Sequence, residues 1–187
     1  MRLVLGLSML LAACAQPAPQ QRAPDRIVEP RAFAGPAPRG DALLKVAMLS
    51  GQNAARAAVG VAPLMWNDAL AADARRYADQ MARTGRFAHA EQPQGLGREG
   101  ENLWTGTRDA YRYREMVDGW IAEKRYFKNG VTPDFSTTGN YEDVAHYTQI
   151  IWRGSSAVGC AMASNSTDDY LVCRYSPPGN VVGQKAL

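Results

Sequence analysis

Residues 145–152 are Ala145-His146-Tyr147-Thr148-Gln149-Ile150-Ile151-Trp152, and residues 170–180 are Tyr170-Leu171-Val172-Cys173-Arg174-Tyr175-Ser176-Pro177-Pro178-Gly179-Asn180. The first stretch predicts a short helix that begins at Glu142 or Asp143, ends at Trp152 and has His146 near its head. The second stretch alternates along a strand from Tyr170 to Tyr175. Residues 157–163 alternate in the same way, and a polar turn over residues 164–169 separates the two runs. We therefore expect a helix followed by a β-hairpin.

Upstream of this region the sequence predicts three more helices. One runs from Asp41, its expected N-cap, to Ala58. A second follows Trp66, is capped by Asn67 or Asp68 and stops at Gly85. A third amphipathic stretch runs from Asp109 to about Tyr126. Helices come first and strands last, with no alternation of the two, so the fold class is α+β rather than a doubly wound sheet.

The N-terminus has the features of a targeting segment. Arg2 precedes an apolar run from Leu3 to Ala13, which is too short to span a bilayer. The run ends in Leu11-Ala12-Ala13-Cys14, which resembles a bacterial lipobox, so Cys14 is the predicted lipid anchor. The alternative is an A-x-A signal-peptidase site at Ala13-Cys14-Ala15, which would remove Cys14 and release the protein.

Proline is concentrated directly after this segment. Six of the 11 prolines lie between residues 15 and 40, at positions 17, 19, 24, 30, 36 and 38. A stretch of this composition cannot bury enough apolar surface to fold and should form an extended tether. The sequence thus divides into a signal peptide (1–13), a lipidated cysteine and tether (14–40) and one folded domain (41–187). We expect an exported protein that is an outer-membrane lipoprotein or is secreted.

Composition excludes several classes of function. The chain has 187 residues, 46% of them hydrophobic, and a formal net charge of +3 with no basic run. Nucleic-acid binding is therefore not expected, and we expect a monomer. Glycines 95, 97 and 100 lack the preceding strand and the lysine of a phosphate-binding loop, so we interpret this segment as a flexible loop.

The chain has three cysteines, and two of them lie on the predicted strands. In an oxidising compartment Cys160 and Cys173 are most simply a disulfide. A catalytic thiol would need a nearby base, and the chain has two histidines in all. Zinc binding by thiolates is disfavoured because no CxxC pair exists.

The two stretches quoted first resemble the signature motifs of the CAP superfamily, whose SCP domain occurs in cysteine-rich secretory proteins, antigen 5 and plant pathogenesis-related group-1 proteins. Gly100-Glu101-Asn102-Leu103 and Trp120-Ile121-Ala122-Glu123 agree with two further motifs of that family, in the same order. The C-terminal residues 177–184 are most similar to the plant branch, and the lipobox suggests a bacterial member. The resemblance implies a three-layer α-β-α sandwich with a small antiparallel sheet. The chain departs from the family at Ala145, where glycine is usual.

The resemblance also implies a metal site. In the family, two histidines and two glutamates line a cleft that holds a divalent ion, often Zn2+. The matching residues are His89, Glu101, Glu123 and His146, with Asn102, Tyr147 and Gln149 as supporting donors. Imidazole nitrogens and carboxylate oxygens suit zinc. The residues alone leave other roles open. Each histidine could be a surface or core residue, Glu101 could pair with Arg98 or cap a strand, and Glu123 could be a solvated helix residue.

Three functions follow as hypotheses. The resemblance implies a binding module for a lipid or sterol. A set of aromatic side chains could line an apolar groove for such a ligand, although a helix packed in the core would show the same pattern. The set is Tyr111, Tyr113, Trp120, Tyr126 and Phe127. The alternative is a metal-dependent hydrolase in which Glu101 or Glu123 is the general base. The third is an envelope protein that docks a partner protein or a wall glycan.

Overall fold

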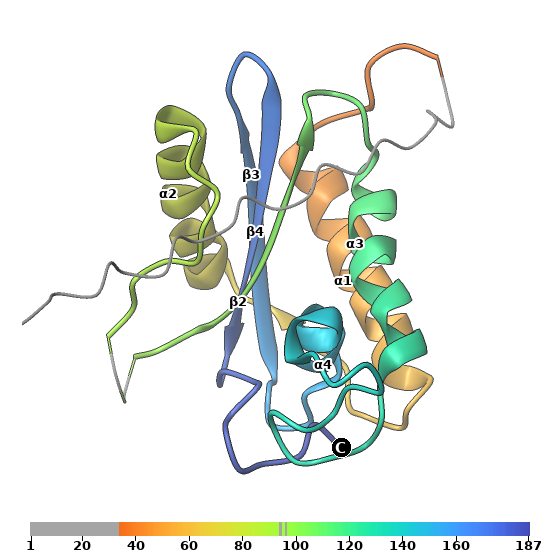
Figure 1. Ribbon diagram of the computed structural model, residues 1–187. Helices are drawn as coiled ribbons and strands as arrows, with labels where there is room; N and C mark the ends of the chain where they lie inside the picture. The colour runs from red at the N-terminus through yellow and green to blue at the C-terminus, as the bar shows by residue number, and fades with distance from the viewer. Residues whose placement is uncertain (1–33, 94, 96) are drawn as a thin grey trace, which may run out of the picture.

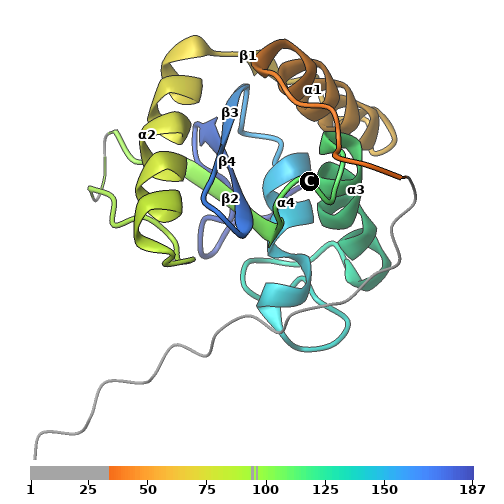
Figure 2. The same ribbon diagram turned by 90° about the horizontal axis from the view of Figure 1, so that it is seen from above.

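The computed structural model describes residues 34–93, 95 and 97–187. A four-stranded sheet forms the middle layer. Helix α2 (Asp68–Thr84) covers one face, and α1 (Asp41–Ala57), α3 (Tyr113–Ala122) and α4 (Ala145–Ile151) cover the other (Figures 1 and 2). The α+β three-layer sandwich predicted from the sequence is confirmed.

The strands of the sheet are β1 (Met65–Trp66), β2 (Gly100–Thr107), β3 (Ala157–Ser164) and β4 (Asp168–Ser176), in the spatial order β1-β3-β4-β2. The predicted hairpin is β3–β4, and it is antiparallel. The short β1 runs parallel to β3, so the sheet is mixed rather than purely antiparallel. The sequence reading did not predict β2 as a strand. It forms because all eight of its residues pair with β4.

The helices begin and end close to the predicted positions. The Asn67 side chain caps α2 by accepting from the N–H groups of Ala69 and Leu70 at 2.9 and 3.1 Å, and Gly85 ends the helix with a φ of 68°. The predicted cap of α1 was wrong, because Gly40 is the N-cap and Asp41 is the first helical residue.

The other two predicted helices each combine α-helical and 3₁₀ turns. Helix α3 starts at Tyr113, later than predicted, and the 3₁₀ turn η1 (Glu123–Tyr126) continues it. The predicted fourth helix is the 3₁₀ turn η2 (Tyr141–Val144) followed by α4.

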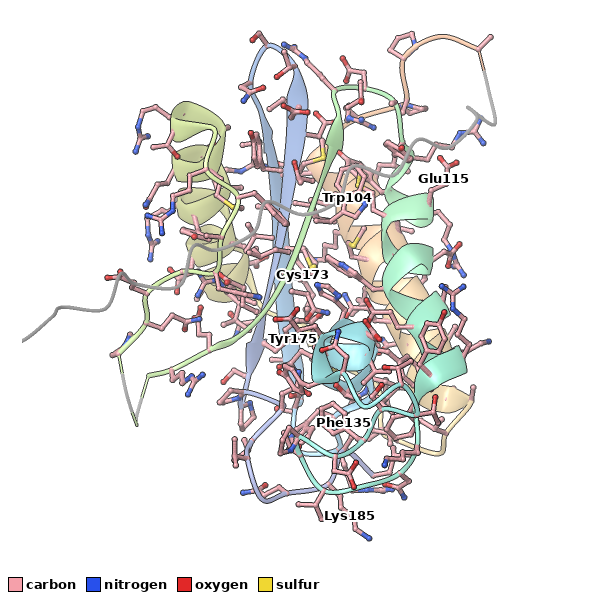
Figure 3. The ribbon with its side chains drawn as sticks, viewed as in Figure 1. Trp104, Glu115, Phe135, Cys173, Tyr175 and Lys185 are labelled. Carbon is pink, nitrogen blue, oxygen red and sulfur yellow. A yellow bond between two sulfur atoms is a disulfide. The ribbon has the colours of Figure 1, made fainter. Side chains whose placement is uncertain are left out.

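Each face of the sheet has its own hydrophobic core. The core beneath α2 is the smaller of the two and includes Ala74, Ala78 and Val172. The larger core beneath α1, α3 and α4 contains Trp120, Trp152 and the cystine of Cys160 and Cys173. Figure 3 shows Cys173 and Tyr175 projecting from β4 into the interior, whereas Glu115 and Lys185 lie at the periphery.

The aromatic set predicted as an apolar groove belongs largely to this larger core. Tyr113 and Trp120 are buried in it, and Tyr111 and Phe127 are partly buried against it. Tyr113 and Trp120 are therefore core residues, and Tyr111 and Phe127 pack against the core.

The predicted disulfide is present between Cys160 and Cys173. The two cysteines face each other across β3 and β4, with their Cα atoms 4.1 Å apart. The bond therefore joins neighbouring strands in the centre of the sheet.

Residues 1–33, with the predicted signal peptide, Cys14 and most of the tether, lie outside the described residues. The last residues of the predicted tether contact the domain. The Ala37 N–H donates to the Asp109 carbonyl at 2.9 Å, and Arg39 pairs with the buried Asp169 at 2.6 Å. Within the described part of the chain no helix is long and apolar enough to cross a membrane.

Candidate functional site

His146 lies in the first turn of α4 and is held by Glu123, where α3 passes into η1. Its Nδ1 is 2.6 Å from Glu123 Oε1, and the N–H groups of His146 and Tyr147 both donate to Glu123 Oε2 at 3.1 Å. The Trp120 indole stacks on the imidazole, with ring centroids 5.7 Å apart. Glu123 therefore contacts both the start of α4 and the His146 ring. Its carboxylate accepts from N–H groups of the first helical turn, which have no partners within the helix.

His89 follows α2 and is held in the same way by Glu101 on β2. Its Nδ1 is 2.7 Å from Glu101 Oε1, and the same oxygen accepts from the Ala90 N–H at 3.0 Å. The second oxygen of Glu101 lies 2.8 Å from Arg174 Nη2. The Glu101 side chain is only 4% exposed, whereas that of His89 is 66% exposed.

The four predicted ligands thus form two histidine–glutamate pairs. The residues that the structure describes contain no group of three or more His, Cys, Asp or Glu that could hold a metal ion. In each pair a carboxylate engages Nδ1, which leaves Nε2 as the free ring nitrogen. This is how histidine ligands are usually oriented in metal sites. The chemistry of each pair suits a cation on an imidazole Nε2, with the glutamate behind the ring.

A polar cleft of about 460 Å³ opens beside the His89–Glu101 pair, between β2 and the loop after β4, and neither His146 nor Glu123 is among the residues that line it. Its lining includes His89, Glu101, Tyr141, Gln149 and residues 178–180. The Gln149 side chain supports the wall: its Oε1 accepts from the Gly179 N–H at 2.9 Å, and its Nε2 donates to Ser155 Oγ at 3.2 Å. A Cβ atom at Gly100 or Gly179 would collide with the Gln149 amide, so a larger residue at either position would displace that side chain from the cleft wall.

Comparison with known proteins identifies the family. Residues 49–175 match the cysteine-rich secretory protein family, CAP, and this match covers more than half of the chain. The chain belongs to the CAP family. Tobacco pathogenesis-related protein 1C is 40% identical over 137 residues, which are 73% of this chain and 76% of that protein. A pathogenesis-related protein of the PR-1 type from Sambucus nigra is 40% identical over 134 residues, 71% and 75% of the two chains.

Solved structures of CAP proteins show the same fold. NaASP2 with Zn2+ is 19% identical, has a TM-score of 0.63, and aligns with 80% of this chain and 88% of its own. An outer surface protein from Borrelia burgdorferi is 15% identical, has a TM-score of 0.51, and aligns with 73% of this chain and 92% of its own. At these identities the likeness establishes the fold alone.

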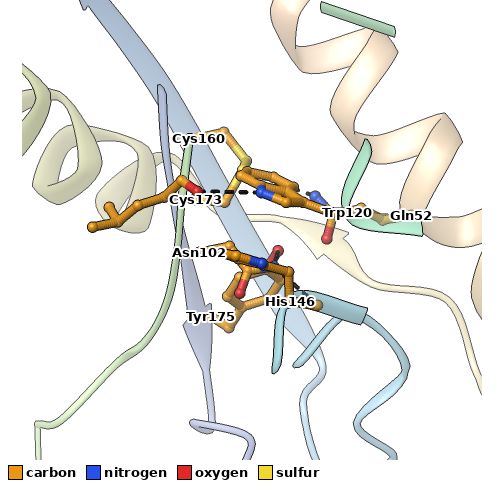
Figure 4. The surroundings of a disulfide bond; sticks show 8 residues. Gln52, Asn102, Trp120, His146, Cys160, Cys173 and Tyr175 are labelled. Carbon is orange, nitrogen blue, oxygen red and sulfur yellow. Dashed lines mark hydrogen bonds between the residues drawn. A yellow bond between two sulfur atoms is a disulfide. The ribbon is translucent and has the colours of Figure 1, made fainter. Parts of the chain in front are cut away.

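The three predicted supporting donors have different roles in this CAP protein. Asn102 Nδ2 donates to the His146 carbonyl at 3.1 Å and lies 3.2 Å from the Tyr175 hydroxyl, so it fastens α4 to the sheet (Figure 4). Burial raises the pKa of the Tyr175 hydroxyl far above its ordinary value, so Tyr175 stays protonated. Tyr147 contributes its N–H to Glu123, and its ring packs on Phe127 in the core. Gln149 shapes the cleft wall, as described above.

The sequence reading missed two residues of the CAP site, Arg174 and Tyr77. Arg174 lies opposite Glu101 in the β2–β4 register, and its guanidinium stacks over the Tyr77 ring at 5.4 Å. Burial, and then the charge of Glu101, raise the pKa of the Tyr77 hydroxyl. Arg174 could have been found from the sequence if residues 100–107 had been recognised as a strand antiparallel to β4.

Proposed function

We propose that this CAP protein is an exported binding module whose two histidine–glutamate pairs hold a divalent cation such as Zn2+. The observation that carries the proposal is that both histidines of the chain have Nδ1 engaged by a motif glutamate, which leaves Nε2 available. That NaASP2 was solved with Zn2+ supports the choice of ion. Bound zinc would supply a positive charge able to attract an anionic or carbonyl oxygen of a ligand.

In this proposal the residues of the site divide into ligands and supports. His89 and His146 supply the nitrogen ligands, and water completes the coordination. Glu101 and Glu123 fix the ring orientations, because each also accepts from a backbone N–H of its histidine segment or of the helix start. Their carboxylates are therefore outer partners of the metal rather than direct ligands.

The test is calorimetric titration of the domain with Zn2+. His89→Ala and His146→Ala should each weaken binding by about 100-fold, because each removes one ligand. Glu101→Gln and Glu123→Gln should weaken it by roughly tenfold, as expected for outer partners. Asp118→Asn on the exposed face of α3 is the matched control and should not change the affinity.

Proton competition gives a second measurement of the same site. Protons compete with metal for an imidazole nitrogen, so zinc affinity should be lower at acidic pH than at neutral pH. Absence of zinc binding at neutral pH would exclude the proposal, as would a His89→Ala/His146→Ala double variant that binds as tightly as the native protein.

The ligand of the module is also a proposal. A lipid or sterol, or a partner protein or wall glycan, would bind at a surface other than the buried aromatic side chains of α3. Metal-dependent hydrolysis at the cleft is the alternative activity. Metal analysis and lipid mass spectrometry on one purified sample would distinguish ligand binding from hydrolysis. Bound lipid without enzymatic turnover supports a binding module, and bound zinc with turnover supports a hydrolase.

We further propose export by residues 1–13 and anchoring through a lipidated Cys14. The family is one of secretory proteins, which supports export. Cys14→Ser should move the protein from the membrane fraction to the soluble fraction, and a native N-terminus at Gln16 without acyl chains would contradict anchoring.

A further inference from the structure

Arg174 lies beside the His89–Glu101 pair and contacts Glu101. It lies on β4, where its side chain is only 7% exposed. Its Nη2 is 2.8 Å from Glu101 Oε2, and its Nη1 is 3.4 Å from Glu99 Oε2. A guanidinium is always charged, so a full positive charge is buried beside one of the two motif glutamates.

The contacts of Arg174 lead back to His89. Its guanidinium lies over the Tyr77 ring, and the Tyr77 hydroxyl donates to the Ala88 carbonyl, the residue before His89. His89 in turn contacts Glu101, and Glu101 contacts Arg174. The four side chains form a closed ring that joins α2, the segment after it, β2 and β4.

The two glutamates therefore differ in charge balance. Glu101 carries one negative charge, which Arg174 compensates at ion-pair distance. Glu123 accepts from backbone N–H groups and from His146, and it forms no ion pair with Lys or Arg of the described residues 34–93, 95 and 97–187. Glu99 lies 3.4 Å from the same guanidinium and shares its charge. The positive charge of Arg174 repels a cation near His89 and offsets part of the attraction of Glu101.

Resting on the proposed function, we propose that Arg174 sets the cation affinity of this cleft, by neutralising Glu101 and so weakening binding of a divalent cation at His89. The His146–Glu123 pair has no such counter-charge among the residues that the structure describes. Arg174 acts through Glu101 and is a positioning and affinity-setting residue, not a ligand.

The experiment is a zinc titration of four proteins at neutral pH. Arg174→Gln removes the charge while keeping an amide donor for Glu101, and it should raise the zinc affinity about tenfold. Arg174→Lys keeps the charge and should bind zinc as the native protein does. Arg114→Gln is the matched control, because it removes the same charge from an exposed i,i+4 pair with Asp118 and should leave the affinity unchanged.

A double variant shows that the effect passes through Glu101. Glu101→Gln in the Arg174→Gln background should abolish the tenfold gain, because the carboxylate that Arg174 offsets in the native protein is then absent. Should Arg174→Gln fail to fold without metal, Arg174→Leu refolded with and without Zn2+ gives the same comparison. A larger rise in Tm with zinc for Arg174→Leu than for the native protein supports the inference.

The outcomes separate this inference from the function on which it rests. If the native protein binds zinc and Arg174→Gln binds it no more tightly, the inference about Arg174 is wrong and the metal proposal stands. If neither binds zinc, both are wrong. If Arg174→Gln binds and the native protein does not, the role of Arg174 is supported and the native chain is not a zinc protein.

Discussion

At the scale of single residues, the interior of this protein contains charged groups with defined partners. Arg56 on α1 is 1% exposed. Its guanidinium donates to four carbonyls, those of Ala62, Ile150, Trp152 and Ser155, at 2.6–2.9 Å. Burial lowers the pKa of Arg56 from its usual value. The carbonyls at the end of α4 have no helical partners, so Arg56 satisfies groups that would otherwise be buried and unpaired.

Arg56→Met should therefore lower the free energy of unfolding by at least about 3 kcal/mol, since several buried carbonyls lose their donor. Arg114→Met, which breaks an exposed pair on α3, should cost about 0.5 kcal/mol or less. Urea denaturation of both variants measures the difference. Equal stability of the two variants would contradict the role assigned to Arg56.

Glu99, just before β2, gives the fold a pH dependence. Burial raises its pKa to about 7, and a hydrogen bond with Asp73 contributes. Between the ordinary pKa of glutamate and this raised value, the Glu99 carboxyl keeps its proton in the folded state, whereas an ordinary glutamate in the unfolded state has lost it. Unfolding then releases a proton, so the contribution of Glu99 to stability decreases as the pH rises from about 4.5 to 7.

Glu99→Gln should remove that decrease, because glutamine resembles the protonated acid at every pH. Relative to this variant, the native protein should lose stability between about pH 5 and pH 7 and show a constant difference at higher pH. Thermal unfolding over pH 5–8 measures it. The exposed Glu142→Gln variant is the control and should follow the native pH profile.

At the scale of elements, the β3–β4 hairpin is the most strongly fixed unit. Every residue of β3 pairs with β4, and the disulfide links residues 13 positions apart in the centre of the hairpin. In Figure 4 Trp120 lies beside this cystine, and its Nε1 donates to the Leu103 carbonyl of β2 at 3.2 Å. The bond thus constrains the hairpin to which both β1 and β2 attach.

Removing the disulfide with Cys160→Ala/Cys173→Ala should reduce the free energy of unfolding by about 3 kcal/mol, the expected effect for a loop of this length. Most of the effect should arise in the unfolded chain, so the near-UV spectrum of the folded variant should be unchanged. Thiol labelling of the denatured, unreduced native domain should find neither cysteine free. Two labelled thiols would show that the bond does not form.

At the scale of the whole molecule, the segment before α1 is attached at the end of the sheet remote from the cleft. Arg39 pairs with Asp169, which is 0% exposed and faces Thr105–Thr107 in the β2–β4 ladder. The cleft lies at the opposite end of β2, at Gly100 and Glu101. Arg39 also donates to the Tyr111 carbonyl at 2.9 Å. The folded unit therefore includes residues before the predicted boundary at Asp41.

A shortened chain that begins at residue 34 should unfold at the same denaturant concentration as a chain that begins at residue 14. A chain that begins at residue 41 should be less stable by about 2 kcal/mol, because it leaves the buried Asp169 without its cation. Arg39→Gln in the longer chain should reproduce most of this loss. If the chains that begin at residues 34 and 41 are equally stable, the contacts of Arg39 do not contribute to folding.

Much of this architecture could be predicted from the sequence, because the relevant interactions are local. The apolar spacing of α2, its Asn67 cap and Gly85 stop, and the alternation of β3 and β4 are properties of short segments. The motifs around Glu101, Glu123 and His146 indicated the family, and the two motif glutamates do contact the two histidines of the chain. The cysteine pair was predictable because both cysteines lie on strands joined by one turn.

Only the tertiary structure decided how these residues are combined. Residues 100–107 become a strand because β4 offers them a partner about 70 residues away. The pairing of each glutamate with one histidine, the Arg56 contacts with α4, and the Arg174 ion pair with Glu101 all join distant segments. Local propensity does not encode such contacts, because their partners are set by which faces of the helices and the sheet are buried together. The sequence therefore determined which residues could form the site, and the packing of α2, β2, β4 and α4 determined which of them bind one another.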